Sequence, residues 1–196
     1  MTALAPPSTR QPATISTAAL AGGFVAAVGL RIALGGLGAA RSVPAGLAFA
    51  AALVALSAAR GVRLGTGWPE LAVGVAGGAF ICLPALAARV AGGSAHRPGG
   101  SFLLWAVVVA AVAAAEELFL RGALFDAVSE IAGRPAAIAA GAVAFAGLHV
   151  PLYGWHVVPL DLAVGIWLGA LRTVTGSWLS PAVAHVTADL AGWWLR

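Results

Sequence analysis

Long apolar stretches separated by short polar breaks run along almost the whole chain. A helix that crosses the hydrocarbon layer needs about 20 such residues. Gly, Pro and Arg mark the breaks, as is typical of helix ends. The pattern predicts an all-α, polytopic membrane helix bundle of about seven transmembrane helices. Their expected ranges are 15–40, 43–59, 68–90, 101–130, 134–150, 157–174 and 179–195.

The domain organisation follows from the same pattern. Residues 1–13 contain three prolines and several hydroxyl residues, so we expect a disordered N-terminal tail. The first apolar run is longer than the core of a signal peptide, which has about 7–15 residues, and further runs follow it. We therefore interpret it as a retained helix and residues 14–196 as a single membrane domain. Abundant Ala and Gly favour close helix packing in a compact bundle.

The composition supports a lipid environment and argues against a nucleic-acid partner, an intramolecular disulfide and a thiolate metal site. Hydrophobic residues make up 61% of the chain and charged residues only 9%, against about 25% charged in soluble domains. The 11 basic residues are all arginines, scattered mostly at expected helix ends, so we predict no nucleic-acid partner. The single cysteine, Cys82, excludes an intramolecular disulfide and a thiolate metal cage.

A cluster of ionisable residues interrupts the fourth apolar run. Glu116, Glu117 and Arg121 lie there, although each charge within a span costs a few kcal/mol. Glu117 and Arg121 are four residues apart on one helix face, which predicts an ion pair. Glu116 points about 100° away, so we expect it to remain free to act as a general base. The alternative is an interfacial charge cluster at a helix end.

Two histidine patterns follow on later helices. Phe145 and His149 share one face, as do His185 and Asp189. Asp189 could orient the His185 ring, or the pair could stitch helices together by a hydrogen bond. A glutamate, two histidines and an aspartate on three helices are side chains suited to amide hydrolysis.

Three further polar residues have a plainer interpretation. His156 and Asp161 are expected at an interfacial helix end. Arg31, inside the first helix, is explained by helix tilt, by snorkelling or by a carboxylate from another helix.

These motifs resemble those of the CPBP family, which comprises CAAX prenyl proteases and bacteriocin-processing enzymes and is also called the Abi or type II CAAX endopeptidase family. The family pattern is Glu-Glu-x-x-x-Arg, Phe-x-x-x-His and His-x-x-x-Asn/Asp, in that order. The matching residues here are Glu116, Glu117, Arg121, Phe145, His149, His185 and Asp189. The resemblance covers about residues 100–195, the expected catalytic core. It implies an active site sunk in the bilayer and open to water from one side.

The resemblance also implies a role for each catalytic residue. Glu116 would activate water together with His149, and His185 and Asp189 would form the oxyanion site, with Glu117, Arg121 and Phe145 in support. Members closest to the CAAX proteases tend to carry Asn where this chain has Asp189. An ionised Asp cannot donate a hydrogen bond, so Asp189 would be protonated or would orient His185.

The expected function is therefore that of an intramembrane endopeptidase that cleaves a membrane-associated protein or peptide, in contact with the lipid bilayer and without a cofactor. One alternative is a zinc-dependent version, with Zn²⁺ held by Glu116, His149 and His185, although the chain lacks a His-Glu-x-x-His zinc helix. The same residues are also compatible with a non-catalytic scaffold or immunity-type relative, and with a small proton-coupled transporter. The expected location is a bacterial cell membrane, as a multi-pass protein.

Overall fold

The computed structural model describes residues 15–62, 67–92 and 100–195, and these ranges contain helices and no strand. The predicted tail at residues 1–13 lies outside them. In chain order the helices are α1 (Thr17–Gly35), α2 (Val43–Arg60), α3 (Trp68–Val90), α4 (Phe102–Glu117), the π-helix η1 (Leu118–Leu124), α5 (Phe125–Tyr153), the short 3₁₀-helix η2 (Trp155–Val157), α6 (Val158–Thr175) and α7 (Leu179–Leu195).

Local sequence signals set several of these helix ends. The Ser16 hydroxyl accepts a hydrogen bond from the Ala19 N–H at 3.2 Å and so caps α1. Pro44 and Pro159 lie in the first turns of α2 and α6, where a missing N–H costs little. Gly61 follows α2 in the left-handed conformation. The breaks predicted from Gly and Pro are confirmed at these positions.

Gly133 divides the helical stretch that runs from α4 through η1 to α5. Gly133 has φ 80° and ψ 168°, a conformation that glycine adopts without a Cβ clash. The second part of α5 folds back, so that the Phe145 ring lies 5.2 Å from the Arg121 guanidinium carbon. The predicted interruption between residues 130 and 134 is therefore confirmed.

Five helical segments in the described residues are long and apolar enough to cross a membrane. They are 17–35, 43–60, 68–90, 102–153 and 155–175. The all-α class is confirmed, whereas the predicted count of about seven crossings is not. The number is lower for two reasons. Residues 102–153, which Gly133 divides into two parts, make up one of the five segments, and α7 has only 17 residues.

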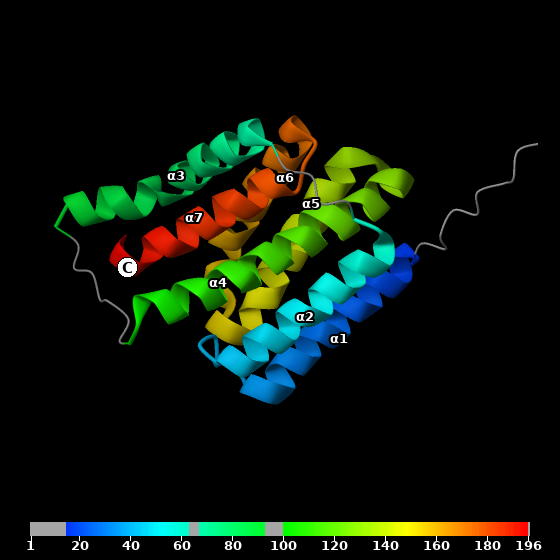
Figure 1. The fold of residues 1–196 in the computed structure, drawn as a ribbon, viewed down its shortest axis with the longest axis horizontal. Coiled ribbons are helices and arrows are strands. Elements are labelled where there is room, and N and C mark those ends of the chain that lie inside the picture. The colour runs from blue at the N-terminus through cyan, green and yellow to red at the C-terminus, as the bar shows by residue number, and fades with distance from the viewer. Residues whose placement is uncertain (1–14, 63–66, 93–99, 196) are drawn as a thin grey trace, which may run out of the picture.

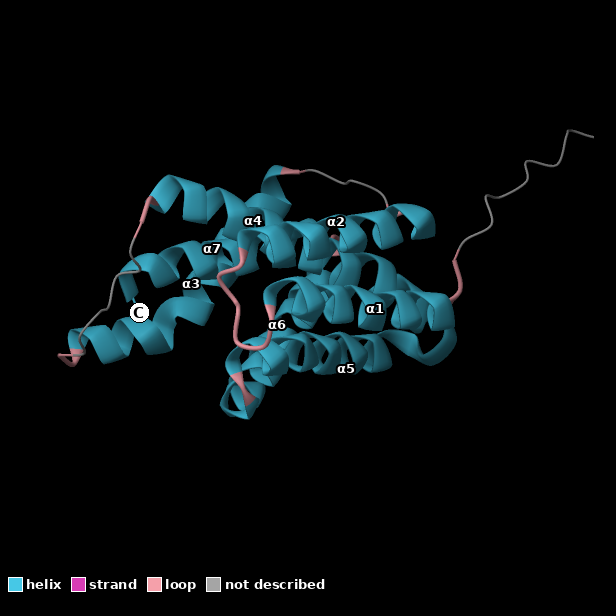
Figure 2. Cartoon of the chain, turned by 90° about the horizontal axis from the view of Figure 1, so that it is seen from below, coloured by secondary structure: helices cyan, strands magenta, loops and turns pink. Residues whose placement is uncertain are grey.

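The helices form a row with two helices behind it. Figure 1 shows α4 between α7 and α2, with α3 on the outer side of α7 and α1 on the outer side of α2. The neighbours α5 and α6 pack behind this row, and Figure 2 shows α5 on the side opposite α4 and α2. Segments far apart in sequence therefore meet in the middle of the bundle, where η1 contacts α2, α5, α6 and α7.

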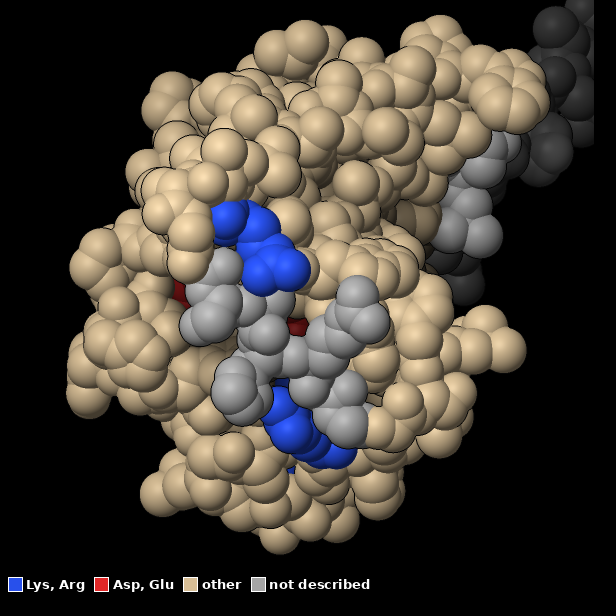
Figure 3. All heavy atoms as spheres, turned by 90° about the vertical axis from the view of Figure 1, so that its left-hand side faces the viewer, with Lys and Arg blue, Asp and Glu red and all other residues tan. Residues whose placement is uncertain are grey.

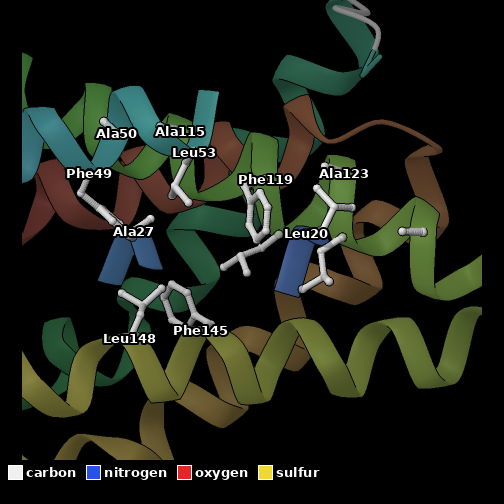
Figure 4. Close-up of a cluster of buried hydrophobic side chains, with 13 residues drawn as sticks. Leu20, Ala27, Phe49, Ala50, Leu53, Ala115, Phe119, Ala123, Phe145 and Leu148 are labelled. Atoms are coloured by element: carbon white, nitrogen blue, oxygen red, sulfur yellow. The ribbon is translucent and has the colours of Figure 1, made fainter. Parts of the chain in front are cut away.

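The main apolar core lies between α1, α2, the α4–η1 region and α5 (Figure 4). Leu20, Phe49, Leu53 and Phe119 are fully buried in it. Phe145 points into the same cluster from α5. Because Ala115 and Phe119 belong to this cluster, the intervening Glu116 and Glu117 lie on its border.

The outer surface is apolar, as a lipid-facing surface should be. Large hydrophobic side chains are exposed on every long helix; Leu103 on α4, for example, is 71% exposed. Figure 3 looks at the end of the bundle where α4 begins and α7 ends, and charged side chains occupy only small areas of that face. The protein is an integral membrane protein.

Glycine allows the closest helix contact in the bundle, between α3 and α7. A Cβ atom on Gly74 would lie 2.6 Å from Val183 Cβ and 2.8 Å from the Ser180 carbonyl oxygen. Because backbone cannot move aside cheaply, we expect Gly74→Ala to lower the free energy of unfolding by about 1–3 kcal/mol. The matched control is Gly22→Ala on α1, where a Cβ would meet nothing within 4 Å. Thermal melting of both variants in detergent measures the effect, and equal melting temperatures would contradict this packing.

Candidate active site

The buried pair of Glu117 and Arg121 forms the centre of the site. Arg121 Nη1 donates to Glu117 Oε1 at 2.8 Å, and the two side chains are 1% and 0% exposed, Arg121 first. The ion pair predicted from their spacing is confirmed. Arg121 Nη2 also donates to the Gly165 carbonyl oxygen on α6 at 3.0 Å. The pair therefore joins η1 to α6 as well as satisfying its own charges.

Arg121 lies in the π-helical segment η1, an irregularity that often occurs at functional sites. Its carbonyl oxygen accepts a hydrogen bond from Arg172 Nε on α6 at 2.8 Å. Arg172 is itself fixed by Asp126 at 2.7 Å and lies over the Phe125 ring at 4.9 Å. This second set of contacts holds the backbone of η1 against α6.

Glu116 has a cation of its own, which comes from the first helix. Arg31 Nη1 lies 3.4 Å from Glu116 Oε1, and Glu116 is only 3% exposed. The expectation that Glu116 would remain unpaired is wrong, because α1 brings a charge that is 85 residues away in sequence. Of the three explanations for Arg31, a carboxylate from another helix is the one that the structure bears out.

His185 connects α7 to the glutamate pair. Its Nδ1 lies 3.0 Å from Glu117 Oε1, and its Nε2 lies 3.6 Å from Asp189 Oδ2 one turn further along α7. Glu117 Oε1 thus interacts with both Arg121 and His185, while Glu117 Oε2 is buried with no hydrogen-bond partner among the described residues. The ring of His185 is held between two carboxylates.

Phe145 gathers the polar side chains around one aromatic ring. The His149 and His185 rings meet it edge to face, with centroids at 4.7 Å and 5.2 Å. The Arg121 guanidinium lies over the same ring. Such cation–π and edge-to-face contacts favour defined orientations. Phe145 therefore packs against three polar neighbours and orients them.

His149 has an acidic partner that the sequence interpretation missed. Its Nδ1 lies 3.3 Å from Asp161 Oδ2 on α6 and 3.1 Å from the Phe145 carbonyl oxygen. The sequence pattern placed Asp161 only at an interfacial helix end. A signal was present in the order of the helices, because the end of one predicted helix and the start of the next must lie at the same side of the membrane. His149 near the end of α5 and Asp161 near the start of α6 therefore come together.

The site residues fall into three groups. Glu117, Arg121, His185 and Asp189 form one chain of contacts, His149 and Asp161 form the second, and Glu116 and Arg31 form the third. The hydrogen bonds and ion pairs among the described residues link Glu116 to Arg31 and His149 to Asp161, rather than to each other. As placed, no three His, Cys, Asp or Glu side chains in the described ranges gather closely enough to hold a metal ion, so the trio of Glu116, His149 and His185 does not fit zinc in this arrangement.

Comparison with known proteins agrees with the resemblance of the motifs. The family model described as type II CAAX prenyl endopeptidase Rce1-like matches residues 98–191, which include all three motifs. No curated protein and no solved structure matches the chain. The family predicted from the motifs is thereby confirmed for this segment.

The buried ion pair makes a prediction about stability. Arg121→Ala leaves Glu117 buried without its closest cation, and we expect it to lower the free energy of unfolding by about 3–5 kcal/mol. Removing both charges, in Arg121→Met with Glu117→Gln, should cost less than Arg121→Ala alone. Thermal or denaturant unfolding in detergent measures both. If Arg121→Ala unfolded with the wild-type free energy, the ion pair would not contribute to the stability of the bundle.

Proposed function

We propose, since residues 98–191 belong to the family of Rce1-like type II CAAX prenyl endopeptidases, that the protein hydrolyses a peptide bond of a membrane-associated protein or peptide. The observation that carries the proposal is the burial of Glu116, Glu117, Arg121 and His185 in an apolar bundle, with Arg121 and His185 against the Phe145 ring. Charges at this depth are costly and mark functional sites. The three motifs lie on different helices, and their side chains meet inside the bundle: His185 contacts Glu117 and Phe145, and Arg121 contacts Phe145.

In the proposed reaction Glu116 acts as the general base. It takes a proton from a water molecule while the water oxygen attacks the carbonyl carbon of the scissile peptide bond. The carbonyl electron pair moves onto oxygen and forms a tetrahedral oxyanion. When the intermediate collapses, the carbon–nitrogen bond breaks, the proton passes to the leaving amine, and a carboxylic acid and an amine are released. His149 assists these proton transfers, with Asp161 orienting its ring.

His185 stabilises the oxyanion in this proposal. In its imidazolium form both ring nitrogens carry a hydrogen. Nδ1 donates to Glu117, and Nε2, which lies 3.6 Å from Asp189 Oδ2 and so beyond hydrogen-bond distance of that atom, is the donor for the oxyanion. Donors fixed before the reaction stabilise developing negative charge without reorganising. The 3.6 Å separation from His185 Nε2 supports an orienting role for Asp189, which fits an aspartate where relatives tend to carry asparagine.

A second candidate is a non-catalytic relative that binds a membrane partner through the same region. The Arg31–Glu116 contact favours it, because an ion pair between α1 and α4 stabilises the bundle whether or not a reaction takes place. A zinc-dependent reaction is a variant of the first candidate, and it requires Glu116, His149 and His185 to come closer together than they lie here. The binding function and the zinc reaction each predict outcomes that differ from those of the glutamate mechanism.

The catalytic assignment predicts a graded loss of activity. Glu116→Gln and His149→Ala should each lower kcat by about 100- to 10,000-fold, because each removes a proton-transfer group. Both variants should remain folded. The matched control is Glu130→Gln, whose carboxylate is 64% exposed and pairs with Arg60 outside the site. Cleavage of a quenched library of membrane-proximal peptides, with purified protein in detergent, measures the effect.

The same assay separates the three mechanisms. Cleavage by the wild type that is unaffected by a chelator supports the glutamate mechanism, whereas loss in chelator and recovery with zinc supports metal ligation. If wild type and Glu116→Gln are equally inactive, and a cellular phenotype survives Glu116→Gln, the binding function is the better account.

A further inference from the structure

The first helix carries a buried charge that faces the proposed active site. Arg31 lies on α1 and is 9% exposed, although its neighbours in sequence, Leu30 and Ile32, are apolar. A buried arginine within a span is costly unless it is paired. This helix lies far outside residues 98–191, the segment that matches the family model.

The surroundings of Arg31 direct its guanidinium to one oxygen of Glu116. Its Nη1 lies 3.4 Å from Glu116 Oε1. Its guanidinium carbon lies 4.9 Å from the centre of the Phe49 ring on α2. Phe49 is fully buried, so the ring forms a fixed surface against which the arginine lies. Two helices outside the matched segment, α1 and α2, thus combine to place one charge.

The neighbouring charges around Glu116 already have partners of their own. Arg121, on η1, is bound to Glu117 and to the Gly165 carbonyl oxygen. His185, on α7, is bound to Glu117 and lies beside Asp189. His149, on α5, is paired with Asp161 of α6. Two adjacent buried glutamates need two cations, and among the ion pairs of the described ranges Arg31 is the cation that contacts Glu116.

We infer that Arg31 is a positioning residue for the proposed reaction, which holds the Glu116 carboxylate through Oε1 and so makes α1 part of the active site. The inference rests on the proposed function. Arg31 touches the general base rather than the water or the substrate, so it acts through Glu116. A glutamate side chain has several rotatable bonds, and a fixed partner at one oxygen limits the directions in which it can receive a proton.

The test compares Arg31→Met with Arg31→Lys and with a matched control, Arg60→Met. Arg60 also joins two helices through an ion pair, with Glu130, but it lies outside the site. For a peptide that the wild type cleaves, Arg31→Met should lower kcat by about 100-fold, the scale of a misplaced catalytic group, with KM nearly unchanged. Arg31→Lys should recover part of this loss, because it restores a cation. Arg60→Met should keep the wild-type kcat.

A stability measurement separates this inference from the proposed function. Melting temperatures of Arg31→Met, Glu116→Gln and the double variant form a cycle. If the pair exists, the double variant should melt no lower than Arg31→Met alone. Additive losses would overturn the inference, and so would a kcat of Arg31→Met equal to that of Arg60→Met. Coupling in the cycle together with a wild type that cleaves no peptide would instead overturn the proposed function, because the carboxylate would be held but not used.

Discussion

Two adjacent carboxylates buried in an apolar bundle are the constraint on which the rest of this structure depends. Glu116 and Glu117 are 3% and 0% exposed, and a buried charge without a cation costs far more than a buried ion pair contributes. The bundle satisfies Glu117 locally, through Arg121, and Glu116 at long range, through Arg31. The same contacts join helices that are far apart in sequence: α1 to α4, α7 to α4, and η1 to α6. Site and fold are therefore stabilised by the same interactions, so that a change to one charge alters both.

Apolar packing and polar chemistry meet at Phe145. One part of its environment is the main core, with Leu148 and Phe119 among its members, and the other is the set of Arg121, His149 and His185. An aromatic ring can serve both because its faces attract cations while it still fills volume in the core. Rotamers locked by packing are what hold catalytic groups within a fraction of an ångström. Close packing of Phe145 in the core therefore also fixes the orientation of Arg121, His149 and His185.

The local features of this chain were predictable from sequence, and the long-range ones were not. Helix ranges follow from apolar runs bounded by Gly and Pro, since each signal acts within a few residues. The Glu117–Arg121 pair and the His185–Asp189 pair also follow, because residues four apart share a helix face. The partner of Glu116 could not be found in this way, since no helical period relates residues that are 85 apart. Asp161 was an intermediate case, because helix order places it beside His149 but spacing alone does not. The count of about seven crossings is not confirmed: five segments are long and apolar enough, one of them is the stretch 102–153 that turns at Gly133, and α7 has only 17 residues.

The different partners of the two glutamates support different roles for them. Glu117 Oε1 receives Arg121 at 2.8 Å and lies 3.0 Å from His185, within the range of strong charge-assisted hydrogen bonds or close to it. A carboxylate held this firmly from two helices is suited to maintaining structure, because moving it would break both contacts. Glu116 has a single, longer contact of 3.4 Å with Arg31. This contact balances its charge but constrains the carboxylate less than the two contacts of Glu117 do. In the proposed reaction these contacts are consistent with Glu116 as the base and with Glu117 as the residue that fixes Arg121 and His185. On this view the first glutamate depends on α1 for its charge balance, and the second depends on the helices of the matched segment.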